Sequence, residues 1–300
     1  MNAAAYGALF NILAPISLII LIGYWLAKKS EKIDTVGMSR LAMLVGTPAL
    51  VFSTLTTTEI SSTVLLEVSL GALCVCFSAI IIAVICLKTL NYSLGTFLPS
   101  LTMPNSANLG LPLVLLTFGD DGLAFGIAFY FVIAVFQYSV MPIVVAGYFS
   151  LRSILQEPLI WAVAAAICII FSGTKVPSVI ASTTQILGGM VIPVMLVLLG
   201  ASIAKLAVKD LKKTIMLACL RLIIGLVAGI IAITVLGTTG IASGTIFLMA
   251  TMPSALVTYV FAARYNREPD TVAGLVVTST AITLLVLPLI LLVAIRIAGV

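Results

Sequence analysis

The most constraining feature of the sequence is the run Thr89–Gly119, which contains no charged residue. An uncharged run of more than about 20 residues is typical of a membrane span. Its central part, GTFLPSLTMPNSANLGLP (95–112), nevertheless carries three prolines and two asparagines. Because proline lacks a backbone N–H and clashes with the preceding turn, Pro104 predicts a helix interruption between Met103 and Asn105. Irregular backbone at membrane depth needs protein or water to satisfy it, so this span is a candidate binding site.

The same pattern occurs a second time. Residues 95–104 and 244–253 both read G-T-x5-T-M-P, so Pro253 repeats the position of Pro104 149 residues further on, almost half of the 300-residue chain. Interrupted spans at corresponding places in two halves are a sequence-level indication of the binding site of a secondary transporter. We therefore expect a second broken helix at Pro253.

The composition selects the class of protein. The chain is 62% hydrophobic and 8% charged, with a mean hydropathy of +1.31. A water-soluble domain needs more polar surface than this, and a transmembrane barrel would show alternating apolar and polar residues. The sequence predicts an all-α polytopic membrane protein whose main surroundings are the lipid bilayer. The basic residues are scattered singly or in pairs among apolar runs, which argues against a nucleic-acid partner.

Ten apolar runs are long enough to cross the bilayer. They lie at 9–27, 39–56, 64–87, 95–118, 122–146, 156–173, 179–204, 214–236, 241–263 and 271–295. Thirteen of the fifteen Lys and Arg residues lie in or beside the loops that follow odd-numbered runs; the other side has Lys175 and Arg296. By the positive-inside rule, both termini are expected outside the cytoplasm of a multi-pass protein of the plasma membrane.

Five spans per half imply an inverted repeat, because the second half then enters the membrane in the opposite sense. We expect one repeat in residues 1–149 and the other in 150–300, with spans 4 and 9 antiparallel. If these broken helices cross at Pro104 and Pro253, four half-helix ends meet near mid-membrane. Helix N-termini carry partial positive charge and free N–H groups, so such a crossing favours an anion.

Three motifs together resemble the auxin efflux carrier family, which includes bacterial malonate-type carriers and plant PIN transporters. They are PNSANLGLPL (104–113) after the polar interruption, TPALVF (47–52) in the second span, and Pro193 with Gly200 in the seventh. The similarity in length, span number and repeated proline covers essentially the whole chain.

The resemblance implies a fold with crossed discontinuous helices 4 and 9, as in sodium/proton antiporter-like and bile-acid-symporter-like proteins. Spans 1, 2, 6 and 7 would form a scaffold bundle, and spans 3–5 and 8–10 a mobile transport bundle. Pro104 and Pro253 would be the crossover residues, with Asn105 beside a substrate carboxylate. The second half departs from the first, because Ser254 and Ala255 follow Pro253 where Asn105 and Ser106 follow Pro104.

Polar side chains near the two prolines are the candidate substrate ligands: Thr102, Asn105, Ser106, Asn108, Thr251, Ser254 and Thr258. Asn105 and Asn108 are three residues apart, so in a helix they share a face and can donate to a carboxylate or coordinate a cation. The alternative role is hydrogen bonding between membrane helices. The Ser and Thr hydroxyls have a similar alternative, which is bonding back to their own helix.

Charged residues offer little in mid-span. Glu67 lies a few residues inside the third run, Asp120 and Asp121 are expected in a solvated loop, and Arg221 is expected to reach the cytoplasmic interface by snorkelling. There is no histidine, the five cysteines are expected to be packing residues, and no phosphate-binding motif occurs. We therefore expect no enzyme, no cofactor and no metal site.

These features predict a secondary transporter of a small organic anion, a carboxylate of auxin- or malonate-like chemistry. Its coupling stays open between uniport, proton symport and sodium symport. One alternative is a sodium-coupled organic anion symporter resembling the bile-acid symporter family. Another is a membrane sensor or scaffold without transport. A homodimer is expected if the scaffold bundle exposes an apolar face.

Overall fold

Helices make up every regular element of the described chain in the computed structural model, which covers residues 3–29, 34–57, 62–147, 155–205 and 210–300. The first half contains α1 (Ala3–Lys29), α2 (Thr35–Leu41), the π-helix η1 (Ala42–Gly46), α3 (Thr47–Thr57), α4 (Ser62–Thr89), α5 (Leu94–Thr102), the π-helix η2 (Ser106–Gly110) and α6 (Leu111–Ala146). The second half contains α8 (Pro158–Ser172), α9 (Ser178–Gly189), α10 (Val191–Lys205), α11 (Leu211–Leu236), α12 (Gly240–Ala250), α13 (Leu256–Arg264) and α14 (Pro269–Ala298).

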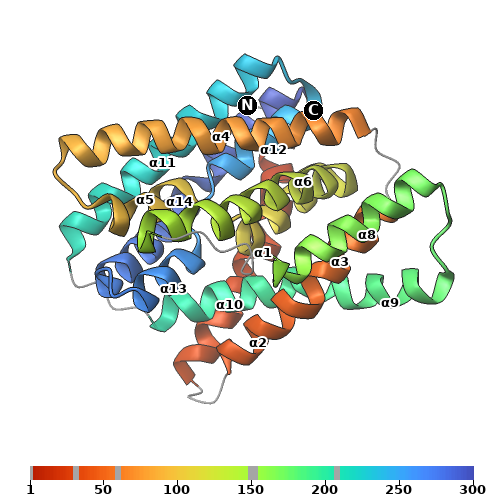
Figure 1. Cartoon of the computed structure of the whole chain (residues 1–300), viewed down its shortest axis with the longest axis horizontal. Coiled ribbons are helices and arrows are strands. Elements are labelled where there is room, and N and C mark those ends of the chain that lie inside the picture. Colours follow the sequence, from red (N-terminus) through yellow and green to blue (C-terminus); the bar gives the residue numbers. More distant parts are fainter. Residues whose placement is uncertain (1–2, 30–33, 58–61, 148–154, 206–209) are drawn as a thin grey trace.

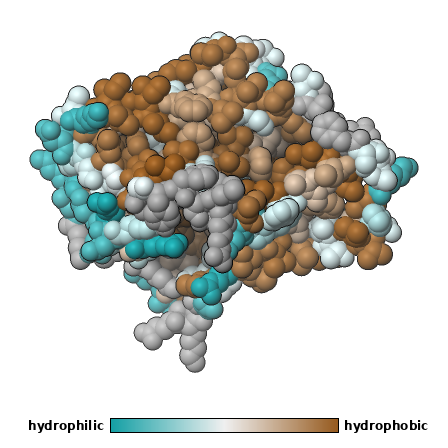
Figure 2. Space-filling model, viewed as in Figure 1, coloured by the Kyte–Doolittle hydropathy of each residue, from teal (hydrophilic) through white to brown (hydrophobic). Residues whose placement is uncertain are grey.

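Six helical segments of the described chain are long and apolar enough to cross a membrane. They are Thr35–Thr57, Thr63–Thr89, Ser106–Val145, Ser178–Ala204, Leu211–Leu236 and Pro269–Ala298. Apolar side chains also cover much of the face seen in Figure 2. Large apolar residues such as Leu21, Ile81 and Leu285 are at least 60% exposed. A surface of this kind is stable against lipid and not against water. The architecture is that of a polytopic membrane protein.

Local sequence signals set several helix ends. Asp34 and Asp210 cap α2 and α11, each accepting a backbone N–H of the first turn through its side chain. Pro158 and Pro269 occupy the first turns of α8 and α14, where their missing N–H costs nothing. Glycines with positive φ end three of these helices: Gly173 ends α8, Gly237 ends α11 and Gly299 ends α14.

Gly119 turns α6 back on itself. Its φ of 68° and ψ of −155° are accessible in practice to glycine alone, and the helix is kinked there. Side chains on both arms then lie together, since a Cβ at Gly126 would lie 2.7 Å from Val114 and 3.2 Å from Leu111. The predicted runs 95–118 and 122–146 are therefore joined by one glycine, without a separate loop.

The helices sort into two neighbourhoods. α1 packs along α10. α3 packs against α8 and α9, and these three helices lie together on the right of Figure 1. α4 packs against α5, α6 and α11, while α14 packs against α11, α12 and α13. The broken segments α5–η2 and α12–α13 lie within the second group. Lys32, Arg152 and Lys209, three of the basic residues used to predict the orientation, lie outside the described residues.

The pair α1 and α10 depends on glycine for its close approach. A Cβ on Gly200 would overlap the Ile20 carbonyl oxygen, and a Cβ on Gly23 would overlap that of Val197. Without a driving force for burying apolar surface from lipid, membrane helices associate through such close backbone contacts. This explains why Gly200 stands seven residues after Pro193 in the motif of the seventh predicted span.

We predict that Gly200→Ala lowers the free energy of unfolding by about 1–3 kcal/mol, the usual cost of overpacking. The measurement is the melting temperature of the detergent-solubilised protein. Gly189→Ala is the matched control, because nothing lies within 4 Å of a Cβ at Gly189. An equal melting temperature for G200A and G189A would contradict the close packing of α1 on α10.

Candidate functional site

The first predicted interruption is present at Pro104. α5 ends at Thr102, Met103 is extended with φ −90° and ψ 109°, and helical structure resumes at Ser106. The helix resumes with a wide turn, in which the Asn105 carbonyl accepts from both Leu109 N (3.3 Å) and Gly110 N (3.1 Å). Such π-turns are frequent at functional sites.

The second predicted interruption is present at Pro253. α12 ends at Ala250 and α13 begins at Leu256, with Ala255 extended at φ −68° and ψ 138°. The two interruptions thus occur at matching places in the G-T-x5-T-M-P repeat. Each leaves a C-terminal half-helix end before the proline and an N-terminal half-helix end after it.

The two breaks meet as a short antiparallel pair of extended segments. Asn105 N donates to Pro253 O at 2.7 Å, and Ala255 N donates to Met103 O at 3.0 Å. Pro104 and Ser254 lie opposite each other between these bonds. This is the position of an antiparallel pair at which neither residue needs to donate to its partner, so proline fits without losing a bond.

A third helix completes the crossing. The Ser254 N–H, which faces away from the pair, donates to the Ser279 hydroxyl of α14 at 3.2 Å. Ser279 in turn donates to Val276 O of its own helix at 3.0 Å. A backbone donor freed by the break is therefore satisfied by a side chain, as burial in an apolar interior requires.

All seven predicted ligand residues are buried around this crossing. The three threonine hydroxyls bond back to their own backbone, Thr102 to Leu98 O (2.7 Å), Thr251 to Leu248 O (2.8 Å) and Thr258 to Ala255 O (2.7 Å). Ser106 Oγ approaches Pro104 O at 3.5 Å, and Ser254 Oγ lies 3.4 Å from Thr258 Oγ1. The local alternative anticipated for the hydroxyls therefore holds for the threonines.

The two asparagines behave differently from the hydroxyls. Asn105 occupies the N-cap position of η2, yet its side chain makes no capping bond. Asn108 Oδ1 is buried and has no hydrogen-bond partner among the described residues. A buried amide without a partner is costly. Neither asparagine side chain therefore caps the helix, and the Asn108 oxygen keeps unused hydrogen-bonding capacity at the crossing.

Electrostatically, the crossing collects helix termini. The helices that begin at Ser106 and Leu256 both point their N-terminal ends at it. Their first N–H groups have no partner within the helix and carry partial positive charge. α5 and α12 contribute two C-terminal ends of opposite polarity. The arrangement offers an anion and a cation distinct places to bind.

The expectation that Arg221 snorkels to the interface is wrong. Its side chain is 2% exposed, and Nη2 donates to Ala250 O at 3.1 Å and to Met252 O at 2.8 Å. These carbonyls lie at the end of α12, where the break leaves them without helix amides, so the guanidinium finds its acceptors inside the protein. The sequence carried one signal for this: Gly225, one turn later, has no side chain to block the approach of the Ala250 carbonyl.

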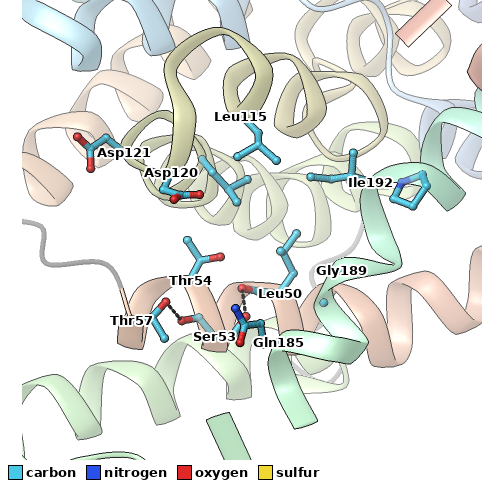
Figure 3. A pocket seen from close by; sticks show the side chains of 13 residues that line it. Leu50, Ser53, Thr54, Thr57, Leu115, Asp120, Asp121, Gln185, Gly189 and Ile192 are labelled. Carbon is cyan, nitrogen blue, oxygen red and sulfur yellow. Dashed lines mark hydrogen bonds between the residues drawn. The ribbon is translucent and has the colours of Figure 1, made fainter. Parts of the chain in front are cut away.

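Two cavities lie at opposite ends of the α2–α3 helix. The larger, about 810 Å³, is bordered by Thr54 and Thr57 at the end of α3 and by Asp120 and Asp121 at the α6 turn. Figure 3 shows Asp120 across this cavity from Thr54. Both aspartates are exposed, as expected, but they lie in α6 directly after the turn at Gly119 and not in a loop, and they line a cavity. Leu50 of the TPALVF motif and Pro193 also line it.

The smaller cavity, about 400 Å³, is bordered by Ser39 of α2, Glu157 and Arg264, and by Leu256 and Val257 at the start of α13. None of the predicted ligand residues lines either cavity among the described residues. The smaller cavity comes close along the chain, since Leu256 is two residues from Ser254. The crossing itself is closed to both sides.

Comparison with known proteins identifies the class. The family model described as membrane transport protein matches residues 8–148 and 142–291, and the chain belongs to this family, that of the auxin efflux carriers. An uncharacterized transporter of Methanocaldococcus jannaschii is 24% identical to this chain over 303 aligned positions, which cover 93% of this chain and 96% of the relative. The protein is therefore a membrane transporter of this family, as the sequence motifs indicated.

We predict that Ser279→Ala lowers the free energy of unfolding by about 1–3 kcal/mol, because it leaves the buried Ser254 N–H unpaired. Ser139→Ala is the control, since the Ser139 hydroxyl bonds only within its own helix, to Val135 O. The melting temperatures of both purified variants provide the comparison. Equal values for S279A and S139A would show that α14 does not hold the crossing.

Proposed function

We propose that this transporter carries a small organic anion, a carboxylate of auxin- or malonate-like chemistry, by alternating access around the crossing of α5–η2 and α12–α13. The antiparallel pairing of the two breaks, which brings two helix N-terminal ends and two under-used asparagines to one buried point, carries the proposal. Helix N-termini and amide donors are suited to a carboxylate. Asn105 and Asn108 are the proposed main ligands, with Ser106 and Ser254 beside them.

The proposed topology is ten spans in two inverted repeats, residues 1–149 and 150–300. The antiparallel crossing supports it, because spans 4 and 9 run in opposite directions only if the second half enters the membrane in the opposite sense. Even span number then places both termini on one side. With basic residues in the loops after odd-numbered spans, that side is the outside of the plasma membrane.

The packing supports a division into two bundles. α1 packs on α10, α3 packs on α8 and α9, and the α2–η1 segment that continues into α3 contacts α10. These helices form the proposed scaffold, which has an exposed apolar face suited to a homodimer. The crossing belongs to the other helices, which form the proposed transport bundle. The cavities lie where the two groups meet, since each is lined by α2 or α3 on one side and by α6 or α13 on the other.

In the proposed cycle the crossing opens in turn to each cavity. In this structure it is closed to both, with Asn105 4% and Ser254 0% exposed. Movement of the transport bundle along α3 would join Asn105 and Asn108 first to the cavity beside Asp120 and then to the cavity beside Glu157. The mobile bundle would carry the anion with the helix ends that bind it.

We predict that at least one small mono- or dicarboxylate raises the melting temperature of the purified protein, and that Asn105→Ala reduces this shift at least about tenfold in apparent affinity, since a lost hydrogen bond to a charged group costs about 1.5–3 kcal/mol. Asn105→Asp should abolish the shift by charge repulsion. The measurement is a thermal-shift titration with a panel that includes malonate and an indole carboxylate.

Ser78→Ala is the matched control for this titration, because the Ser78 hydroxyl bonds within α4, to Cys74 O at 2.7 Å and Val75 O at 3.2 Å. Uptake of the stabilising anion into proteoliposomes then separates transport from sensing. An equal shift in wild type and N105A would remove the anion from the crossing. Binding without uptake would support the sensor alternative.

We also predict that cysteines placed in the two cavities react from opposite sides of the membrane. In a variant without the five native cysteines, Thr57→Cys should be labelled by an impermeant maleimide from outside intact cells. Ser39→Cys should be labelled only after the membrane is opened, because its cavity is expected to face the cytoplasm. Labelling of both from one side would contradict the proposed topology.

A further inference from the structure

Arg221 is a buried cation that the proposed anion site does not use. It lies within α11, eight residues after Lys213, with its side chain 2% exposed. Among the described residues, the ion pair observed joins Lys213 to Glu268, and no carboxylate pairs with Arg221. An arginine in mid-span is expensive and marks a functional position by default. Its partners therefore indicate its role.

Those partners are backbone carbonyls at the open end of α12. Ala250 is the last residue of that helix and Met252 directly precedes Pro253, and both carbonyls accept from the same nitrogen, Nη2. The break at Pro253 removes the amides that would otherwise pair with carbonyls of this turn. The end of α12 also carries partial negative charge. A cation is the group that such an end requires.

Space for the guanidinium is provided by the sequence itself. A Cβ at Gly225 would overlap Ala250 O and would lie 3.1 Å from Arg221 Nη1. Gly225 follows Arg221 by one turn, so it lies beside the arginine on the same face of α11. The missing side chain lets the carbonyl end of α12 lie directly on α11, within reach of the guanidinium.

Carbonyls at broken half-helix ends are the groups that bind a coupling sodium ion in many secondary transporters. We propose that the guanidinium of Arg221 occupies this place permanently as a tethered cation, so that the α12 end neither needs nor binds sodium. The consequence for ion coupling rests on the proposed transport function. It then excludes sodium symport through this helix end and leaves a fixed positive charge beside the anion site.

Arg221 acts here as a positioning residue. The guanidinium holds Ala250 and Met252, and Pro253 O, the next carbonyl, accepts from Asn105 N. Two hydrogen bonds, joined by the peptide bond between Met252 and Pro253, therefore connect Arg221 with Asn105. Loss of the guanidinium should free the α12 carbonyls for another cation and loosen the pairing at the crossing.

The test measures the melting temperature of the purified protein without any anionic substrate, in sodium chloride and in choline chloride of equal concentration. Wild type should melt at the same temperature in both salts. Arg221→Gln should melt lower than wild type in choline, and sodium should raise it by about 2 °C or more, because an ion that binds only the folded state stabilises it. Lys212→Gln removes an exposed charge from the same helix and should behave like wild type.

Arg221→Lys keeps the positive charge and covers the case in which R221Q does not fold. R221K should purify and should melt at the same temperature in both salts. Sodium stabilisation of wild type or of R221K, with no effect of choline, would overturn the proposal. A folded R221Q that is indifferent to sodium would overturn it too. Since no organic anion is present and the chloride concentration is the same in both salts, these results are independent of the carboxylate titration, which alone decides the proposed substrate class.

Discussion

The requirement that every backbone polar group be hydrogen-bonded in an apolar interior governs this structure. Two prolines break two helices at its centre, and each break frees donors and acceptors that lipid cannot satisfy. The structure answers by crossing the breaks, so that Asn105 N and Ala255 N find carbonyls of the other segment. Ser279 and Arg221 satisfy further groups from α14 and α11. The crossing is therefore stable only as part of a bundle that surrounds it.

The same requirement explains how a polar site can exist within so apolar a chain. Hydroxyl groups at the crossing mostly satisfy themselves on their own helices, which lets Thr102, Thr251 and Thr258 be buried at little cost. The amide oxygen of Asn108 does not, and the fold keeps it unpaired among the described residues against a free-energy cost. Together with two helix N-termini, that capacity distinguishes the crossing from ordinary interhelical packing.

The positions of the charged side chains follow the same requirement. Most basic residues lie at helix ends, where water and headgroups are available, but Arg221 is retained in the interior by carbonyls at the end of α12. A helix end can accept a cation in this way because its dipole and unpaired carbonyls act together. Asp120 and Asp121 remain exposed at the mouth of a cavity. The protein interior thus holds a positive group without a carboxylate partner among the described residues.

The sequence by itself determined the helical membrane class, both helix interruptions and the family. Each of these depends on local chemistry: runs of apolar residues, the missing N–H of proline, and motifs such as PNSANLGLPL. The repeat and the family resemblance also predicted that the two interruptions cross, but only the tertiary structure decided which groups pair there. The pairing of Pro104 with Ser254, the bond from Ser279 to the crossing, and the turn of Arg221 toward α12 join residues from 25 to 150 positions apart. No local pattern specifies such partners, because they depend on how close glycines such as Gly225 let two helices approach.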